Sequence, residues 1–147
     1  MQESPDVVDD SVLSAVLDTV LPPNGELPGA GGLGLAASYR QGAAQAPHLG
    51  ASAAAVLVAL PEGFVGSATE EREAVLRRAE EEDPQSFAAL LNLAYNAYYT
   101  DQRVLERIES LTGYAARPPQ PEGYELEPFD ERVLAQVKER APFWREA

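Results

Sequence analysis

Apolar residues at helical spacing, stopped repeatedly by proline or glycine, constrain the fold of this chain more than any other feature of its sequence. In the first such stretch the apolar positions recur every three or four residues: Val12, Leu13, Val16, Leu17, Val20 and Leu21. This spacing forms one face of an amphipathic helix. Pro22 and Pro23 would end that helix, because proline lacks a backbone N–H and the residue before it avoids helical geometry. With alanine, leucine and glutamate abundant, the sequence predicts an all-α protein.

The middle of the chain repeats the pattern. We expect a poorly defined helix at about 33–44 and an alanine-rich helix at about 50–60, which would end before Pro61. Four alanines of that helix would allow close packing: Ala51, Ala54, Ala55 and Ala59. The next helix should begin at an N-cap Thr69, because acidic residues follow it in the first turn, where the helix dipole favours them.

Helix signals continue to the C-terminus. Asp83-Pro84 predicts the start of a helix whose apolar face is Phe87, Leu90, Leu91, Ala94, Tyr95 and Tyr98. Thr100 or Asp101 would cap the next one, which Gly113 would close. A short last helix would carry Val133, Leu134 and Val137.

These signals predict a small helical domain of about six to seven helices with an extended, Pro/Gly-rich C-terminal arm. Residues 1–8 form an acidic N-terminal lead, 9–112 the helical domain, 113–129 the arm, and 130–147 a C-terminal helix and tail. The arm has no hydrophobic periodicity and is longer than most connections in compact domains.

Charge and composition limit the partners. The 147 residues carry a net charge of −13, which repels phosphate backbones and anionic lipid surfaces, so we expect neither nucleic-acid binding nor membrane insertion. The apolar run 51–60 is too short to span a bilayer. The first residues lack the basic and apolar parts of a signal peptide, so we expect a cytoplasmic protein; export together with a signal-bearing partner remains open.

Residues suited to chemistry are few. The segment 29–34 satisfies GxGxxG, but a helix rather than a strand is expected before it, so it is interpreted as a loop that needs positive φ or close packing. His48 is the single histidine, there is no cysteine, and the acidic run 80–83 would spread around a helix end. We therefore expect no catalytic, cofactor-binding or metal-binding residue in this chain.

Tyrosine is the exception, because five of the six tyrosines fall between Tyr95 and Phe129. Helical spacing predicts that Tyr95 and Tyr98 belong to the core. Tyrosine is enriched at interfaces, and prolines reduce the entropy that a docking arm loses. The predicted partner-binding residues are Tyr99, Tyr114, Pro118, Pro119, Pro121, Tyr124 and Phe129. Whether the arm binds a partner or wraps its own domain stays open.

The order of several short motifs resembles a known family. These motifs are Leu17-Asp18-Thr19-Val20-Leu21-Pro22-Pro23, Leu27-Pro28-Gly29-Ala30-Gly31, Leu60-Pro61-Glu62-Gly63-Phe64, Phe87 with Leu90-Leu91, Tyr98-Tyr99-Thr100-Asp101, and the arm from Gly113-Tyr114 to Tyr124. Together they resemble the family of gluconate 2-dehydrogenase subunit 3. The chain departs from that family's pattern in lacking a twin-arginine export signal.

The resemblance implies a function. Members of that family accompany a large FAD-dependent subunit of the glucose–methanol–choline type, which oxidises sugars, polyols or sugar acids and holds the flavin. The chain would then be a non-catalytic small subunit in a hetero-oligomer, with FAD in the partner and no cofactor of its own. The alternative is a stand-alone acidic binding protein, either a polyanion mimic or an adaptor for a basic partner. An enzyme in its own right is the weakest of the three hypotheses.

Overall fold

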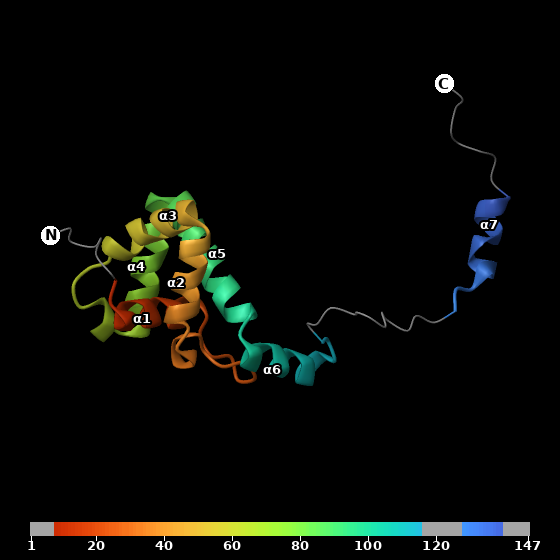
Figure 1. Ribbon diagram of the computed structural model, residues 1–147, viewed down its shortest axis with the longest axis horizontal. Coiled ribbons are helices and arrows are strands. Elements are labelled where there is room, and N and C mark those ends of the chain that lie inside the picture. Colours follow the sequence, from red (N-terminus) through yellow and green to blue (C-terminus); the bar gives the residue numbers. More distant parts are fainter. Residues whose placement is uncertain (1–7, 116–127, 140–147) are drawn as a thin grey trace, which may run out of the picture. The chain divides into compact units, whose positions relative to one another are not determined.

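The computed structural model describes residues 8–115 and 128–139. The chain divides into two units, Met1–Ala116 and Arg117–Ala147. The described residues form α-helices and 3₁₀ turns and contain no β-strand, so the protein is all-α as the sequence predicts (Figure 1). The predicted arm 113–129 is described only at 113–115 and at 128–129.

In its described residues, 8–115, the first unit contains six α-helices and two 3₁₀ turns. In chain order they are α1 (Asp10–Val20), η1 (Gly31–Leu33), α2 (Ala36–Gln45), α3 (Pro47–Val58), η2 (Phe64–Gly66), α4 (Thr69–Glu82), α5 (Pro84–Tyr99) and α6 (Gln102–Thr112). Helix α5 packs most extensively against α3 and also contacts α2 and α4, while α1 lies against η1, α4 and η2 (Figure 1). Fully buried leucines of α1 and α5, Leu13, Leu17 and Leu90, lie in the centre of the core.

Local sequence explains most helix boundaries. Asp9, Asp83 and Asp101 each accept a hydrogen bond from a backbone N–H in the first turn of the following helix, at 2.7, 3.0 and 3.0 Å. These bonds satisfy N–H groups that have no partner within the helix. At the other end of α6, Gly113 adopts the left-handed conformation with φ of 74°, as expected for a glycine that ends a helix.

Helix α4 begins differently from the prediction. Ala68, not Thr69, occupies the N-cap position, and Thr69 is the first helical residue. The carboxylate of Glu71 accepts a hydrogen bond of 3.3 Å from the backbone N–H of Ala68. An acid in the first turn therefore stabilises this end in place of a threonine hydroxyl.

The alanine face predicted for α3 is also wrong. Ala51, Ala54, Ala55 and Ala59 are exposed, and the buried residues of this helix are Ala53, Val56 and Leu57. Close packing occurs instead at Gly50, where a Cβ would lie 2.8 Å from the carbonyl oxygen of Ala43 on α2. Val56 and Leu57, which remove more apolar area from water than alanine does, lie on the buried face, whereas Val58 is 60% exposed.

The second unit is small in its described part. It contains η3 (Glu131–Leu134) and the four-residue helix α7 (Ala135–Lys138). Asp130 caps η3 by accepting from the backbone N–H of Arg132 at 3.0 Å, and the two side chains form an ion pair. Val133, predicted to belong to an apolar helix face, is 69% exposed.

Candidate partner-binding surface

Tyr98 fixes the C-terminal end of α5 to the rest of the first unit. Its side chain is buried, and its hydroxyl donates a 2.7 Å hydrogen bond to the carbonyl oxygen of Pro28. Burial raises the pKa of the Tyr98 hydroxyl, and the neighbouring Tyr99 adds to this effect. The bond joins residues 70 positions apart, so it ties the end of α5 to the connection between α1 and α2.

Tyr95 and Tyr99 lie one helical turn apart on the exposed side of α5. Their ring centroids are 6.3 Å apart, and Tyr99 also meets the ring of Tyr98 edge-to-face at 5.0 Å. Such aromatic contacts are favourable. Tyr95 is 43% and Tyr99 47% exposed. The three rings therefore form an aromatic cluster with two members open to solvent.

Helix α6 is attached to the same connection through arginines. Arg103 donates to the carbonyl oxygen of Leu33 at 2.7 Å. Arg107 donates to the carbonyl oxygen of Glu26 at 2.8 Å and pairs with the Glu26 carboxylate. Arg103 also bonds the side chain of Asp101, which is the main reason why the pKa of that carboxyl is lowered.

The apolar face of α6 extends beyond the core. Val104 is fully buried and Ile108 is partly buried against the core, but Leu111 on the same face is 45% exposed. Tyr114, just after the glycine that ends the helix, is 63% exposed. Figure 1 shows α6 leading away from the packed helices of this unit. Apolar side chains at the end of α6 are therefore available for contact.

The predicted partner-binding residues fall into three groups. Tyr99 and Tyr114 are exposed in the first unit, and Phe129 is 66% exposed in the second. The remaining predicted residues lie outside the described part of the chain: Pro118, Pro119, Pro121 and Tyr124. We use the name aromatic edge for four exposed side chains near the C-terminal ends of α5 and α6, three of them tyrosines: Tyr95, Tyr99, Leu111 and Tyr114. All four belong to the first unit.

Two members of the aromatic edge correct or extend the prediction. Tyr95 was expected in the core, but the core-facing residues at this end of α5 are Ala94, Ala97 and Tyr98. Tyr95 lies beside that face, where the spacing of four residues to Tyr99 pairs the two rings. The spacing of four residues between Tyr95 and Tyr99 is the sequence signal from which this ring pair could have been predicted. Leu111 was not predicted as a site residue.

The glycine-rich segment has a packing role. A Cβ at Gly31 would lie 2.6 Å from the Cβ of Asp18 and 2.7 Å from the carbonyl oxygen of Ser14, and Gly34 has φ of 66°. The element before the segment is helix α1, not the strand that a dinucleotide site requires. The interpretation as a segment that needs positive φ or close packing is confirmed, the first at Gly34 and the second at Gly31.

The other polar candidates lie on the surface. His48 is exposed on α3, and the run 80–83 is exposed, with Asp83 serving as the cap of α5. Within residues 8–115 and 128–139, no three acidic or histidine side chains are grouped as a metal site would need. In the same ranges no helix has both the length and the apolar character to cross a membrane.

Comparison with known proteins gives no relative: no family model, no curated protein and no solved structure matches this chain.

Proposed function

We propose that this chain is a non-catalytic small subunit that binds and stabilises a large FAD-dependent oxidoreductase acting on sugars, polyols or sugar derivatives. The class of partner comes from the sequence resemblance to the subunit 3 family. The observation that carries the binding role is the pair of exposed, mutually packed rings of Tyr95 and Tyr99. Large aromatic side chains held in place before binding lose little entropy on association, and they dominate many interfaces.

The anchoring of the aromatic edge supports the same proposal. The hydroxyl of Tyr98 joins the C-terminal end of α5 to the 22–35 connection. The guanidinium groups of Arg103 and Arg107 join the N-terminal half of α6 to the same connection. A standard interface buries about 800 Å² on each partner. The aromatic edge would supply part of such an area on the first unit.

Co-expression tests the proposal. A large flavoprotein oxidoreductase encoded next to this chain should co-purify with it. Tyr99→Ala should weaken that complex by roughly 30-fold, the effect of a hot-spot residue of about 2 kcal/mol. Val65→Ala is the matched control, because Val65 is 44% exposed but belongs to η2. Equal affinities for the two variants would contradict the role of the aromatic edge.

The contribution of the arm needs a separate test. Deleting residues 115–128 should reduce co-purification of the large subunit. If the deleted chain binds as tightly as the intact one, the arm does not take part in docking. In that case Tyr99→Ala would still test whether the aromatic edge of the first unit binds the large subunit.

A second candidate rests on charge. With a net charge of −13, the chain could bind a basic partner through its acidic surface. Such binding would weaken steeply as salt is raised, since exposed charges are screened within about 8 Å at physiological ionic strength. Binding through the aromatic edge would depend weakly on salt. One salt titration of the complex therefore separates the two functions.

A further inference from the structure

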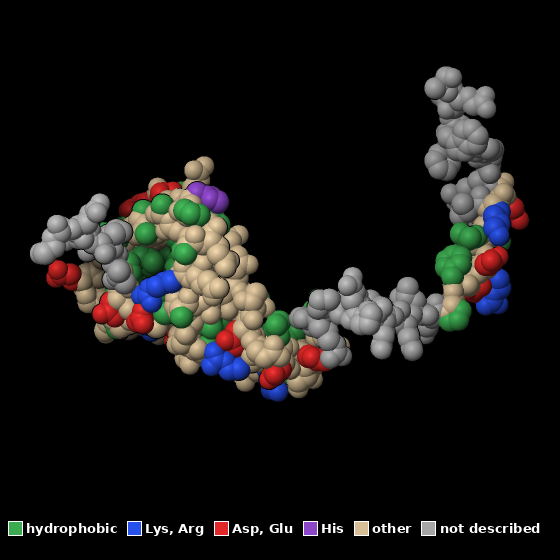
Figure 2. Space-filling model, in the orientation of Figure 1, with side chains coloured by type: hydrophobic (Ala, Val, Ile, Leu, Met, Phe, Trp, Pro, Cys, Tyr) green, Lys and Arg blue, Asp and Glu red, His purple; other side chains and the backbone are tan. Residues whose placement is uncertain are grey.

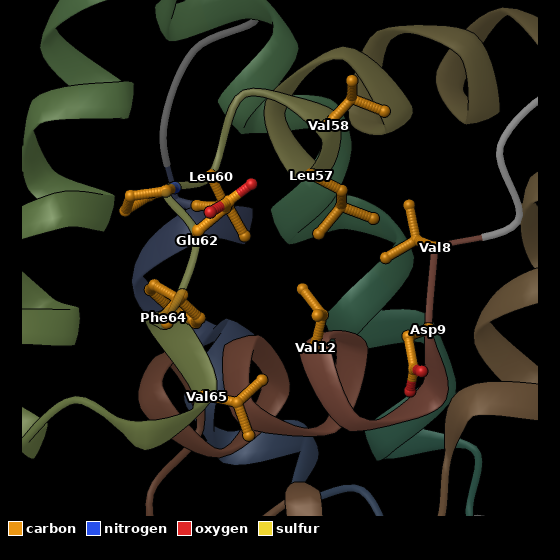
Figure 3. A pocket seen from close by; sticks show the side chains of 11 residues that line it. Val8, Asp9, Val12, Leu57, Val58, Leu60, Glu62, Phe64 and Val65 are labelled. Carbon is orange, nitrogen blue, oxygen red and sulfur yellow. The ribbon is translucent and has the colours of Figure 1, made fainter.

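An apolar cavity lies between the start of α1, the end of α3 and the loop before η2. Its volume is about 360 Å³, and its lining residues include no member of the aromatic edge. In Figure 3 the side chains of Val12, Leu57 and Val65 surround this space, and Val8 forms one side. Figure 2 shows apolar side chains gathered around a hollow on the surface of this unit. An apolar group of another molecule can therefore enter the cavity from solvent.

The apolar surface continues outside the cavity. Val58, at the end of α3, is 60% exposed, and Val65, in η2, is 44% exposed. Both line the cavity, and Figure 3 shows them on opposite sides of it. Apolar side chains that lie exposed together mark sites of interaction. A peptide can fill the cavity with one side chain and cover both valines with its neighbours, so this surface favours a peptide over a small molecule.

Two carboxylates flank the cavity. Asp9 and Glu62 both line it and are exposed. Figure 3 shows Glu62 beside Leu60 on one side of the space and Asp9 beside Val8 on the opposite side. Hydrogen bonds from Ser11 lower the pKa of the Asp9 carboxyl, so this group is ionised at neutral pH. None of the described residues that line the cavity is basic.

The neighbouring charges favour a basic occupant from another molecule. The guanidinium of Arg40 donates to the carbonyl oxygen of Val8 at 2.8 Å and pairs with the carboxylate of Asp10, so its charge is already compensated. The first seven residues of the chain contain Glu3 and Asp6 and no basic side chain. The carboxylates that flank the cavity would repel these acids, whereas they would attract lysine or arginine.

From these observations we propose that the cavity docks a peptide segment of a second partner protein, in which large apolar side chains are flanked on both sides by lysine or arginine. One apolar side chain enters the cavity, and its neighbours cover Val58 and Val65. The flanking cations lie near Asp9 and Glu62. Burial of apolar area supplies the affinity, and charge complementarity selects the partner. This site lies on α1, α3 and η2, so it does not depend on the function proposed for the aromatic edge of α5 and α6.

Three synthetic peptides, added to the full chain and followed by NMR, test the chemistry of the site. They are Lys-Lys-Leu-Phe-Leu-Lys-Lys, its charge-reversed form with glutamates, and Lys-Lys-Ser-Gly-Ser-Lys-Lys. The first should shift the signals of Val12 and Leu57 and should bind at least about tenfold more tightly than each of the others. Equal affinity of the first peptide and either control, or the absence of these shifts, would overturn the proposal.

A pair of charge variants separates the cavity from the net charge of the chain. Glu62→Lys should weaken binding of the leucine–lysine peptide by about tenfold, because it places a cation where the peptide's cation would lie. Glu81→Lys makes the same change of net charge at an exposed position of α4 that does not line the cavity, so it should weaken binding only slightly. Equal losses in the two variants would mean that the peptide responds only to net charge, and the site would be wrong.

A pair of valine variants tests the apolar contact. The double change Val58→Ser and Val65→Ser should weaken binding of the same peptide by about tenfold, because apolar area is lost on both sides of the cavity. Both positions are exposed, so the variant should fold. Val133→Ser is the matched control, a 69% exposed valine of the second unit that should leave affinity unchanged. Unchanged affinity in the double variant would contradict the proposal.

A second copy of the chain and residues 1–7 are the competing occupants. We expect the chain to bind the peptide as a monomer in sedimentation, and with the same affinity after residues 1–7 are removed. A dimer that the double valine change dissociates, without peptide binding to the natural chain, would assign the cavity to a second copy. Peptide binding that appears only after the truncation would assign it to the chain's own first residues. Either result would rule out the proposed partner.

Discussion

Replacing Gly31 by alanine should destabilise the first unit, because the added methyl group meets helix α1. The new Cβ would lie 2.6 Å from the Cβ of Asp18 and 2.7 Å from the carbonyl oxygen of Ser14. Ordinary contacts between carbon atoms are about 3.5–4.0 Å, so the loop or the helix would have to move by roughly 1 Å. The contact with Ser14 is to backbone, which cannot rotate away as a side chain could.

The expected magnitude follows from overpacking. Inserting a methyl group into a close-packed site typically costs about 1–3 kcal/mol. Part of this cost is offset, because replacing glycine by alanine restricts the unfolded chain and stabilises a compatible site by about 0.4–1 kcal/mol. We therefore expect Gly31→Ala to lower the free energy of unfolding by about 1–2 kcal/mol.

Gly32→Ala is the matched control. Gly32 is the next residue of the same 3₁₀ turn, and a Cβ added there meets no atom within 4 Å. This variant should be neutral or slightly stabilising. Urea unfolding followed by circular dichroism at 222 nm would separate the two, since their midpoints should differ by roughly 1 M for a typical slope. Equal midpoints would refute the role of Gly31 in the approach of the loop to α1.

Three further changes test other contacts of the first unit. Tyr98→Phe removes the donor to the carbonyl of Pro28 and should lower the free energy of unfolding by about 1–2 kcal/mol in urea titrations. Leu111→Ala, at a 45% exposed position, should change that free energy by less than about 0.5 kcal/mol while weakening binding of the large subunit in co-purification. The pKa of Asp101 is lowered from 3.8, mainly by the hydrogen bond of Arg103, so its stabilisation is present above pH 3.8 and is lost as pH falls through the lowered value. Urea midpoints between pH 5 and pH 2 should therefore fall less for Asp101→Asn than for the natural chain.

For each of these three variants, one result would contradict the expectation. Wild-type stability of Tyr98→Phe would mean that Pro28 finds another donor, and a large destabilisation by Leu111→Ala would mean that this side chain belongs to the core. If the urea midpoint of Asp101→Asn fell with pH as much as that of the natural chain, the charge of Asp101 would contribute nothing to stability in this pH range.

Local signals in the sequence predict several helix ends closely, because the physics that sets those ends is local. The starts of α2 and α3, expected at about 33 and 50, lie at Ala36 and Pro47. The prolines after α1, the aspartate caps of α1 and α5, and Gly113 after α6 act within one turn of the chain. At the start of α4 the prediction misses by one residue, since Glu71 replaces the expected threonine cap.

The candidate site is less fully predicted, since exposure depends on what packs nearby. Tyr99 and Tyr114 were selected as binding residues and are exposed, whereas Tyr95 was assigned to the core and is not there. Helical periodicity locates the buried face of α5 only to within the width of one side chain. It cannot tell whether a residue at the margin of that face will be covered.

The sequence by itself determined the all-α class and, through local proline, aspartate and glycine signals, the end of α1, the start of α5 and the end of α6. For the glycine segment it left positive φ and close packing open, and the structure shows close packing at Gly31 and positive φ at Gly34. The tertiary structure alone decided that Ala53 rather than the neighbouring alanines of α3 is buried, and that Tyr98 bonds Pro28 while Tyr95 faces solvent. It also decided that the hydroxyl of Tyr39 is buried without a hydrogen-bond partner among residues 8–115 and 128–139. The physical reason is distance along the chain: a cap acts on its own helix, whereas burial depends on elements separated by tens of residues.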